Sequence, residues 1–111
     1  MIKVNLYEEN DKLVGFLAEG HAGYAENDAD DIICSAVTSL AGTLVTAVTD
    51  ILEVDVDYDF KSGKLWCNIY APADKQDEVN LLLRTFEIGC KQIEYSYGSE
   101  YVSVIEPIEI K

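Results

Sequence analysis

His21 is the single histidine of this 111-residue chain, and Cys34 follows it thirteen positions later. A cysteine attacks as its thiolate, and a neighbouring imidazole is the usual base that forms the thiolate near neutral pH. Because the sequence holds no second histidine, cysteine–histidine chemistry in this protein must use His21. The pair therefore indicates a nucleophilic site if the fold brings the two side chains together.

The segment between these two residues has the composition of a loop followed by a helix start. Small and polar residues fill positions 23–30, and a helical hydrophobic pattern begins at Ile33. Asp30 or Asp31 is the expected N-cap, which places Cys34 in the first turn of the helix. A helix N-terminus favours a nearby anion by only about 0.3–1 kcal/mol. His21 must therefore supply most of the thiol activation.

Acidic residues around the loop bear on the same pair. A carboxylate at about 8 Å in a water-like dielectric would disfavour the thiolate by roughly 0.5 kcal/mol, although it would also favour a protonated His21. Asp31 either orients the imidazole or serves only as the helix cap. The backbone N–H groups of Cys34 and Ser35, at the helix start, are the expected donors to an oxyanion. The carboxylates in question are those of Glu26, Asp28, Asp30 and Asp31.

Simpler interpretations of these residues remain open at this point. A helical cysteine among apolar neighbours commonly fills the core, and a loop histidine is commonly a surface residue. Tyr24 either closes over a substrate or covers the first hairpin. The face shared by Trp66, Asn68 and Tyr70 either lines a groove or packs across strands. The two other cysteines, Cys67 on a strand and Cys90 on a helix, are expected to pack in the core.

Alternating and helical hydrophobic patterns follow one another along the chain. Their order predicts one α+β domain over residues 1–111, built from two hairpin-plus-helix units and a final strand, with the helices packed on a mixed β-sheet. The predicted strands cover 2–7, 13–18, 53–60, 65–70 and 101–105, and the predicted helices cover 32–51 and the stretch from about Asp74 to Gly98.

The charge balance limits the classes of partner. The chain has 21 acidic and 8 basic residues and a formal charge of −13. Nucleic acids and anionic membranes need clustered lysine and arginine, so direct binding to either is not expected, whereas a basic protein partner is. No signal or transit peptide and no membrane span is expected. Three widely spaced cysteines fit reduced thiols in the cytoplasm, with no metal site and no cofactor.

The chain also resembles a known family. Gly20-His21-Ala22, a loop of about a dozen residues, and the motif at 31–37 that reads Asp-Ile-Ile-Cys-Ser-Ala-Val resemble the ribosomal-processing cysteine protease Prp family, also called YsxB-like proteins. The likeness in length and element order covers essentially the whole chain, whereas the specific motifs are confined to this segment.

The resemblance implies a bacterial cytoplasmic cysteine endopeptidase that removes an N-terminal extension from the large-subunit ribosomal protein numbered twenty-seven. The family histidine falls on His21, its cysteine on Cys34 and its aspartate on Asp31. The resemblance also implies a homodimer and a substrate-admitting loop, to which Gly23, Tyr24, Glu26 and Asp28 belong. Relatives often carry glycine and basic residues before the Asp-Ile-Cys motif, where this chain has Asn27-Asp28-Ala29-Asp30.

Three hypotheses follow from the sequence. The first is a cysteine protease with Cys34 as nucleophile and His21 as general base, acting on a basic extension. The second is a non-catalytic ribosome-assembly module that holds basic ribosomal protein segments on its acidic surface. The third is a thiol-based redox sensor centred on Cys34.

Overall fold

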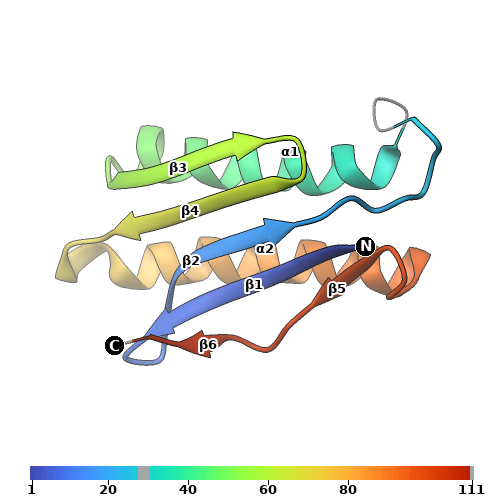
Figure 1. Cartoon of the computed structure of the whole chain (residues 1–111). Helices are drawn as coiled ribbons and strands as arrows, with labels where there is room; N and C mark the ends of the chain where they lie inside the picture. Colours follow the sequence, from blue (N-terminus) through green and yellow to red (C-terminus); the bar gives the residue numbers. More distant parts are fainter. Residues whose placement is uncertain (28–30, 111) are drawn as a thin grey trace.

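The structure is a computed structural model that describes residues 1–27 and 31–110. In the described residues, one six-stranded sheet carries both α-helices on one face (Figure 1). The α+β class predicted from the hydrophobic patterns is confirmed. The elements are β1 (Ile2–Glu9), β2 (Lys12–Glu19), α1 (Ile32–Thr46), the π-helical turn η2 (Ala47–Ile51), β3 (Asp55–Lys61), β4 (Lys64–Tyr70), the 3-10 turn η3 (Ala73–Lys75), α2 (Gln76–Tyr97), β5 (Val102–Val104) and β6 (Ile108–Glu109).

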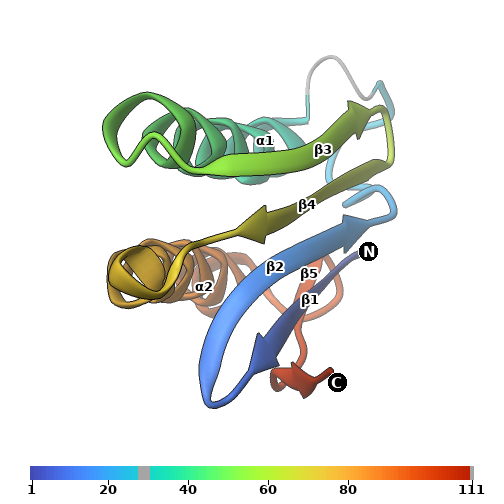
Figure 2. The same cartoon turned by 90° about the vertical axis from the view of Figure 1, so that its left-hand side faces the viewer.

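The strand order in the sheet decides what lies beside the His21 segment. The order is β3-β4-β2-β1-β5, with β6 pairing farther along β1. The β1–β2, β2–β4 and β3–β4 pairs are antiparallel, whereas β5 and β6 run parallel to β1, so the sheet is mixed as predicted. Because β4 lies against β2, the turn between β3 and β4 comes beside the end of β2 (Figure 2).

Helix α1 follows its N-cap, Asp31, and buries one stripe against the core. Asp31, one of the two predicted N-cap candidates, has an extended backbone conformation and caps the helix. The other candidate, Asp30, lies outside the described residues. Val37, Ala41 and Leu44 are among the residues of this helix that are buried. The predicted helix over 32–51 is thus α-helical to Thr46 and then continues as the π-helical turn.

The same helical stretch bears on the membrane expectation. Within the described residues, one helix, Ile32–Ile51, is long enough and apolar enough to cross a membrane, with a mean hydropathy of 1.8. By length and composition alone, this helix therefore does not meet the expectation of no membrane span. The physical reason is that the stripe toward the core is apolar and that Asp50 is the single charged residue of the stretch. The core helix of a folded domain has the same features.

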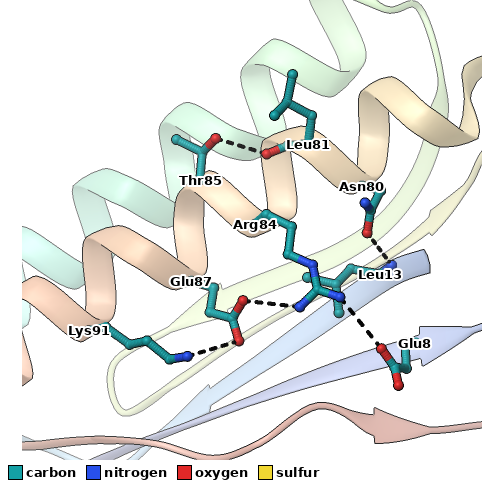
Figure 3. Close-up of polar contacts among 8 residues, drawn as sticks. All are labelled: Glu8, Leu13, Asn80, Leu81, Arg84, Thr85, Glu87 and Lys91. Atoms are coloured by element: carbon teal, nitrogen blue, oxygen red, sulfur yellow. Dashed lines mark hydrogen bonds and ion pairs between the residues drawn. The ribbon is translucent and has the colours of Figure 1, made fainter. Parts of the chain in front are cut away.

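Helix α2 is tied to the first hairpin by polar contacts (Figure 3). The Leu13 N–H donates to Asn80 Oδ1 at 2.7 Å, close to the irregularity in the β1–β2 ladder between Tyr7 and Glu8. The buried carboxylate of Glu87 lies 3.3 Å from Arg84 and 3.6 Å from Lys91, and Arg84 also reaches Glu8 at 3.7 Å. These contacts compensate the burial of the Glu87 charge, which would be costly without a partner.

The C-terminal segment differs from the sequence prediction. A single final strand was expected over 101–105, but β5 covers Val102–Val104 and a second short strand, β6, follows Pro107. Ile108 pairs with Tyr7 of β1. A two-residue strand has too few side chains for a period-two pattern, so only the available edge of β1 decides that it forms.

Strand β2, which leads to His21, is anchored in the core by Phe16. Phe16 of β2 is fully buried, and its ring centroid lies 4.5 Å from that of Phe86 on α2 and 6.5 Å from that of Phe60 on β3. We expect Phe16→Ala to lower the free energy of unfolding by about 3–5 kcal/mol, because it removes apolar contacts and leaves a cavity. Urea denaturation followed by far-UV circular dichroism measures this loss. A change below about 1 kcal/mol would show that Phe16 is not central to the core.

Candidate active site

His21 lies directly after β2, where backbone contacts fix the chain. Gly20 precedes it with φ of +107°, and the Gly20 N–H donates to the Gly63 carbonyl at 2.9 Å. The α-ammonium group of Met1 donates to the His21 carbonyl. The imidazole is exposed and lies so close to Gly63 that a Cβ added there would stand 2.7 Å from Nε2. The backbone around His21 is therefore held from two sides, and the ring rests on the β3–β4 turn.

Cys34 occupies the first turn of α1, as its position after the N-cap predicts. The side chain is half-buried, and the N–H of buried Ala22 donates to its Sγ at 3.4 Å. Since Ala22 directly follows His21 in the chain, this contact joins the histidine segment to the cysteine sulfur. The structure thus brings the beginning of the loop next to the start of α1, although His21 and Cys34 are thirteen positions apart in the sequence.

Asp31 is a fully buried carboxylate that accepts four backbone hydrogen bonds. Oδ1 accepts from Ile33 and Cys34 at 3.0 Å each, and Oδ2 accepts from Tyr24 at 2.9 Å and Ala25 at 3.4 Å. Burial by itself raises the pKa of this carboxyl group, but the four hydrogen bonds together lower the pKa below its ordinary value. The helix-cap role is confirmed, and the same carboxylate also fastens the loop to the helix.

His21 and Cys34 line one cavity of about 580 Å³ at the end of the sheet where α1 begins. Figure 1 shows that the segment after β2, the start of α1 and the β3–β4 turn meet at this end. The cavity can hold a few residues of an extended peptide. Its other walls come from α1 (Ser35, Val37, Thr38 and Ser39), from the β3–β4 region (Phe60, Lys61, Ser62, Gly63, Lys64 and Leu65) and from Ile2, Ala18 and Gly20.

The predicted oxyanion donors are both engaged in this structure. The Cys34 N–H donates to the Asp31 side chain at 3.0 Å, and the Ser35 N–H donates to the Asp31 carbonyl at 3.1 Å. An oxyanion hole needs donors aimed at the reacting carbonyl oxygen. In this geometry the helix cap uses one amide and the first helical turn uses the other, and a role of the two amides at an oxyanion stays a prediction.

Of the predicted substrate-loop residues, the described ones, Gly23, Tyr24 and Glu26, do not line the cavity. Gly23 and Glu26 are exposed, and Asp28 lies outside the described residues. Tyr24 packs edge-on against Tyr97 at 5.5 Å and Tyr101 at 5.2 Å between ring centroids, so it covers the end of α2 rather than the first hairpin. A role of this loop in admitting substrate stays a prediction.

Sequence reasoning missed the contribution of the β3–β4 turn. Residues 61–64 had the composition of a hairpin turn and nothing more. Their position beside His21 follows from the pairing of Glu19 with Lys64, which only the sheet topology establishes. The turn brings Lys61 and Lys64 to the cavity, and among the described residues no acidic side chain lines it.

The other two cysteines are buried thiols, as predicted. Burial, with a smaller contribution from the Asp57 charge, raises the pKa of Cys67 to about 12. Burial and the nearby Glu87 charge raise the pKa of Cys90 to about 12. Both thiols therefore stay protonated near neutral pH and are poor nucleophiles. Within the described residues, no group of three or more histidine, cysteine or acidic side chains can hold a metal ion.

The sequence model of the family described as Cysteine protease Prp matches residues 1–103 of the chain. The chain belongs to this family. It is accordingly a cysteine protease by family, and its one half-buried thiol lies in the cavity described above. A search of curated proteins found no match.

Solved structures share the fold. The chain is 22% identical to the ribosomal processing protease Prp from Staphylococcus aureus in complex with a covalently linked product peptide, with a TM-score of 0.82 over 97% of this chain and 100% of that one. The same enzyme with a substrate peptide is 23% identical, with a TM-score of 0.75 over the same shares. SMU.848 from Streptococcus mutans is 24% identical, with a TM-score of 0.78 over 99% of this chain and 96% of that one.

Asp31→Asn should lower the free energy of unfolding at pH 7 by about 1.5–3 kcal/mol, because a neutral amide cannot accept all four hydrogen bonds. The folded-state pKa of Asp31 lies below its unfolded value of about 3.9, so its stabilisation is full above that pH and is lost as the pH falls through the folded-state pKa. Urea denaturation should show the difference between wild type and variant shrinking in acid. Asp50→Asn, at an exposed position, is the control. An equal loss of unfolding free energy in that variant would contradict the role of Asp31 in fastening the loop to the helix.

Gly63→Ala should displace the His21 ring, because the added Cβ would stand 2.7 Å from Nε2. We expect alkylation of Cys34 at pH 7 to slow by about tenfold and its pH profile to move toward that of a simple thiol near 8.5. Gly98→Ala is the matched control, since φ there is +116° and the three atoms nearest to the added Cβ all belong to the side chain of Glu100. Equal slowing in both variants would show backbone strain rather than displacement of the imidazole.

Proposed function

We propose that this protein is a ribosomal-processing endopeptidase that removes the N-terminal extension of the large-subunit ribosomal protein numbered twenty-seven. Family membership supports peptide hydrolysis by a cysteine, and the similar fold of a ribosomal processing protease that binds substrate and product peptides supports the substrate class. The observation that carries the proposal is the cavity that His21 and Cys34 line together, in which the Ala22 N–H contacts the sulfur.

The proposed reaction has two steps. His21 takes the thiol proton, and Cys34 Sγ bonds to the carbonyl carbon of the scissile peptide while the carbonyl electron pair moves to oxygen. Collapse of this intermediate breaks the C–N bond, and the departing amine receives the proton from His21. Water, deprotonated by His21, then attacks the thioester and releases the extension with a free carboxylate and the enzyme with its thiol. Cys34 and His21 are the catalytic residues of this proposal.

The walls of the cavity refine the expected substrate. Apolar side chains such as Val37 and Leu65 alternate with hydroxyl groups, and the charged residues among the described lining are Lys61 and Lys64. Like charges repel, so we place the basic residues of the extension away from the scissile bond. The formal charge of −13 supports attraction of a basic protein as a whole. We also propose a homodimer in the cytoplasm, without direct binding to nucleic acid or membrane and without a cofactor.

The decisive experiment is cleavage of a peptide that spans the extension junction of the host's own ribosomal protein. We expect the wild type to cut once and Cys34→Ala to lose at least about 10³-fold in kcat, since the nucleophile is absent. Mass spectrometry of both fragments measures the position and the rate. Cys90→Ala is the control, because it makes the same chemical change at a buried thiol.

Three outcomes would contradict the proposal. Cleavage that survives Cys34→Ala would exclude the mechanism. Tight, salt-sensitive binding of the peptide without cleavage, equal in wild type and Cys34→Ala, would instead indicate a non-catalytic assembly module. Oxidation of Cys34 by dilute peroxide without peptidase activity would indicate a redox sensor.

A further inference from the structure

We propose that the backbone N–H of Ala22 is a catalytic group: it stabilises the Cys34 thiolate in the resting enzyme and then donates to the oxyanion of the tetrahedral intermediate. This inference rests on the proposed function for its second half, because the oxyanion exists only during peptide cleavage. Its first half concerns the thiol alone and is independent of any substrate.

The first observation is the contact itself. The Ala22 N–H donates to Cys34 Sγ at 3.4 Å, which is a hydrogen-bond distance for a sulfur acceptor. A hydrogen bond to the charged form of an acid lowers its pKa, so this donor favours the thiolate. The exposed fraction of Ala22 is only 3%, so water competes little for its N–H.

The second observation is that the two donors expected at the helix start are in use. The amides of Cys34 and Ser35 both donate to Asp31 and complete the helix start. Releasing the Cys34 amide would break the buried cap, which carries four hydrogen bonds in all. The Ala22 amide, in contrast, has the sulfur as its acceptor.

The third observation is geometric. When Sγ bonds to the carbonyl carbon, the negative charge moves from sulfur to the oxygen on that carbon, two bonds away. A donor already at the sulfur needs only a small shift to follow the charge, so its interaction is stronger in the transition state than with a neutral carbonyl. Because Ala22 follows His21, one dipeptide then supplies both the general base and the oxyanion donor.

The conformation of the segment keeps this N–H in place. The glycines on either side, Gly20 and Gly23, have φ of +107° and +70°, which allows the sharp turns that direct the dipeptide between them toward α1. The hydrogen bonds from Tyr24 and Ala25 to Asp31 hold the following residues. The donor is thus oriented before any substrate arrives.

The test deletes this single N–H without changing a side chain. Cys34 is a ligation point, so a synthetic fragment 1–33 can be joined to a recombinant fragment 34–111 to make the full chain. Replacing Ala22 by lactic acid converts its amide to an ester. The control is the same replacement at Ala25, whose N–H donates to Asp31 at 3.4 Å and not to the sulfur. The all-amide ligated protein is the reference.

With the junction peptide as substrate, we expect the Ala22 ester to lower kcat by about 10²–10³-fold with KM within about threefold, which is the usual effect of losing one oxyanion donor. The Ala25 ester should stay within about tenfold of the reference. The alkylation rate of Cys34 against pH should show a higher thiol pKa for the Ala22 ester only. A kcat loss below about threefold, or equal losses in the two esters, would overturn the proposal.

A second measurement uses the intact wild-type protein, in case an ester does not fold. The ¹⁵N-bound amide proton of Ala22 should shift with pH at the apparent pKa found by alkylation, and the shift should vanish in Cys34→Ala. An Ala22 resonance that does not respond to the thiol titration would exclude the thiolate contact. If the all-amide protein cleaves no peptide, the proposed function fails, whereas the alkylation and resonance results still decide the role of the N–H at the sulfur.

Discussion

The position of the loop after His21 relative to the start of α1 depends on the hydrogen bonds that the buried carboxylate of Asp31 accepts. Four backbone N–H groups, two from the loop and two from the helix start, converge on its two oxygens. A buried carboxylate without such donors would cost several kcal/mol, so the hydrogen bonds are a condition for its burial. They also occupy the Cys34 amide. One capping interaction therefore holds the loop at the helix start and occupies an amide that would otherwise be an oxyanion donor, which supports the proposal for Ala22.

The second constraint is the insertion of β4 next to β2. This pairing places the β3–β4 turn beside the His21 ring, and the absent side chain of Gly63 leaves room for the imidazole. It also brings Lys61 and Lys64 into the cavity of a chain whose formal charge is −13. The electrostatic environment of the cavity thus differs from that of the whole protein, because long-range attraction reflects the net charge whereas contact specificity reflects local groups.

Much of the site was predictable from residue types. Only one histidine exists, so its choice as the candidate partner of Cys34 required no structure, and the N-cap signature before an apolar helical pattern located the cysteine in the first helical turn. The order of strands and helices was also predictable, because hydrophobic patterns with periods of two and 3.6 residues are local properties of the sequence. The α+β class followed from that order. The hydrogen bonds that the Cys34 and Ser35 amides already make were not predictable, because the competition for the Asp31 oxygens depends on the path of the loop.

The sequence by itself determined the candidate nucleophile Cys34, the candidate base His21 and the element that carries each, because these depend on side-chain chemistry and on periodicity within short segments. Tertiary structure decided which backbone donor meets the sulfur, which turn supports the imidazole, and whether Pro107 is followed by a strand. These features depend on strand pairing between segments distant in the chain, where many registers satisfy the same local pattern and only the packing of the whole core selects one.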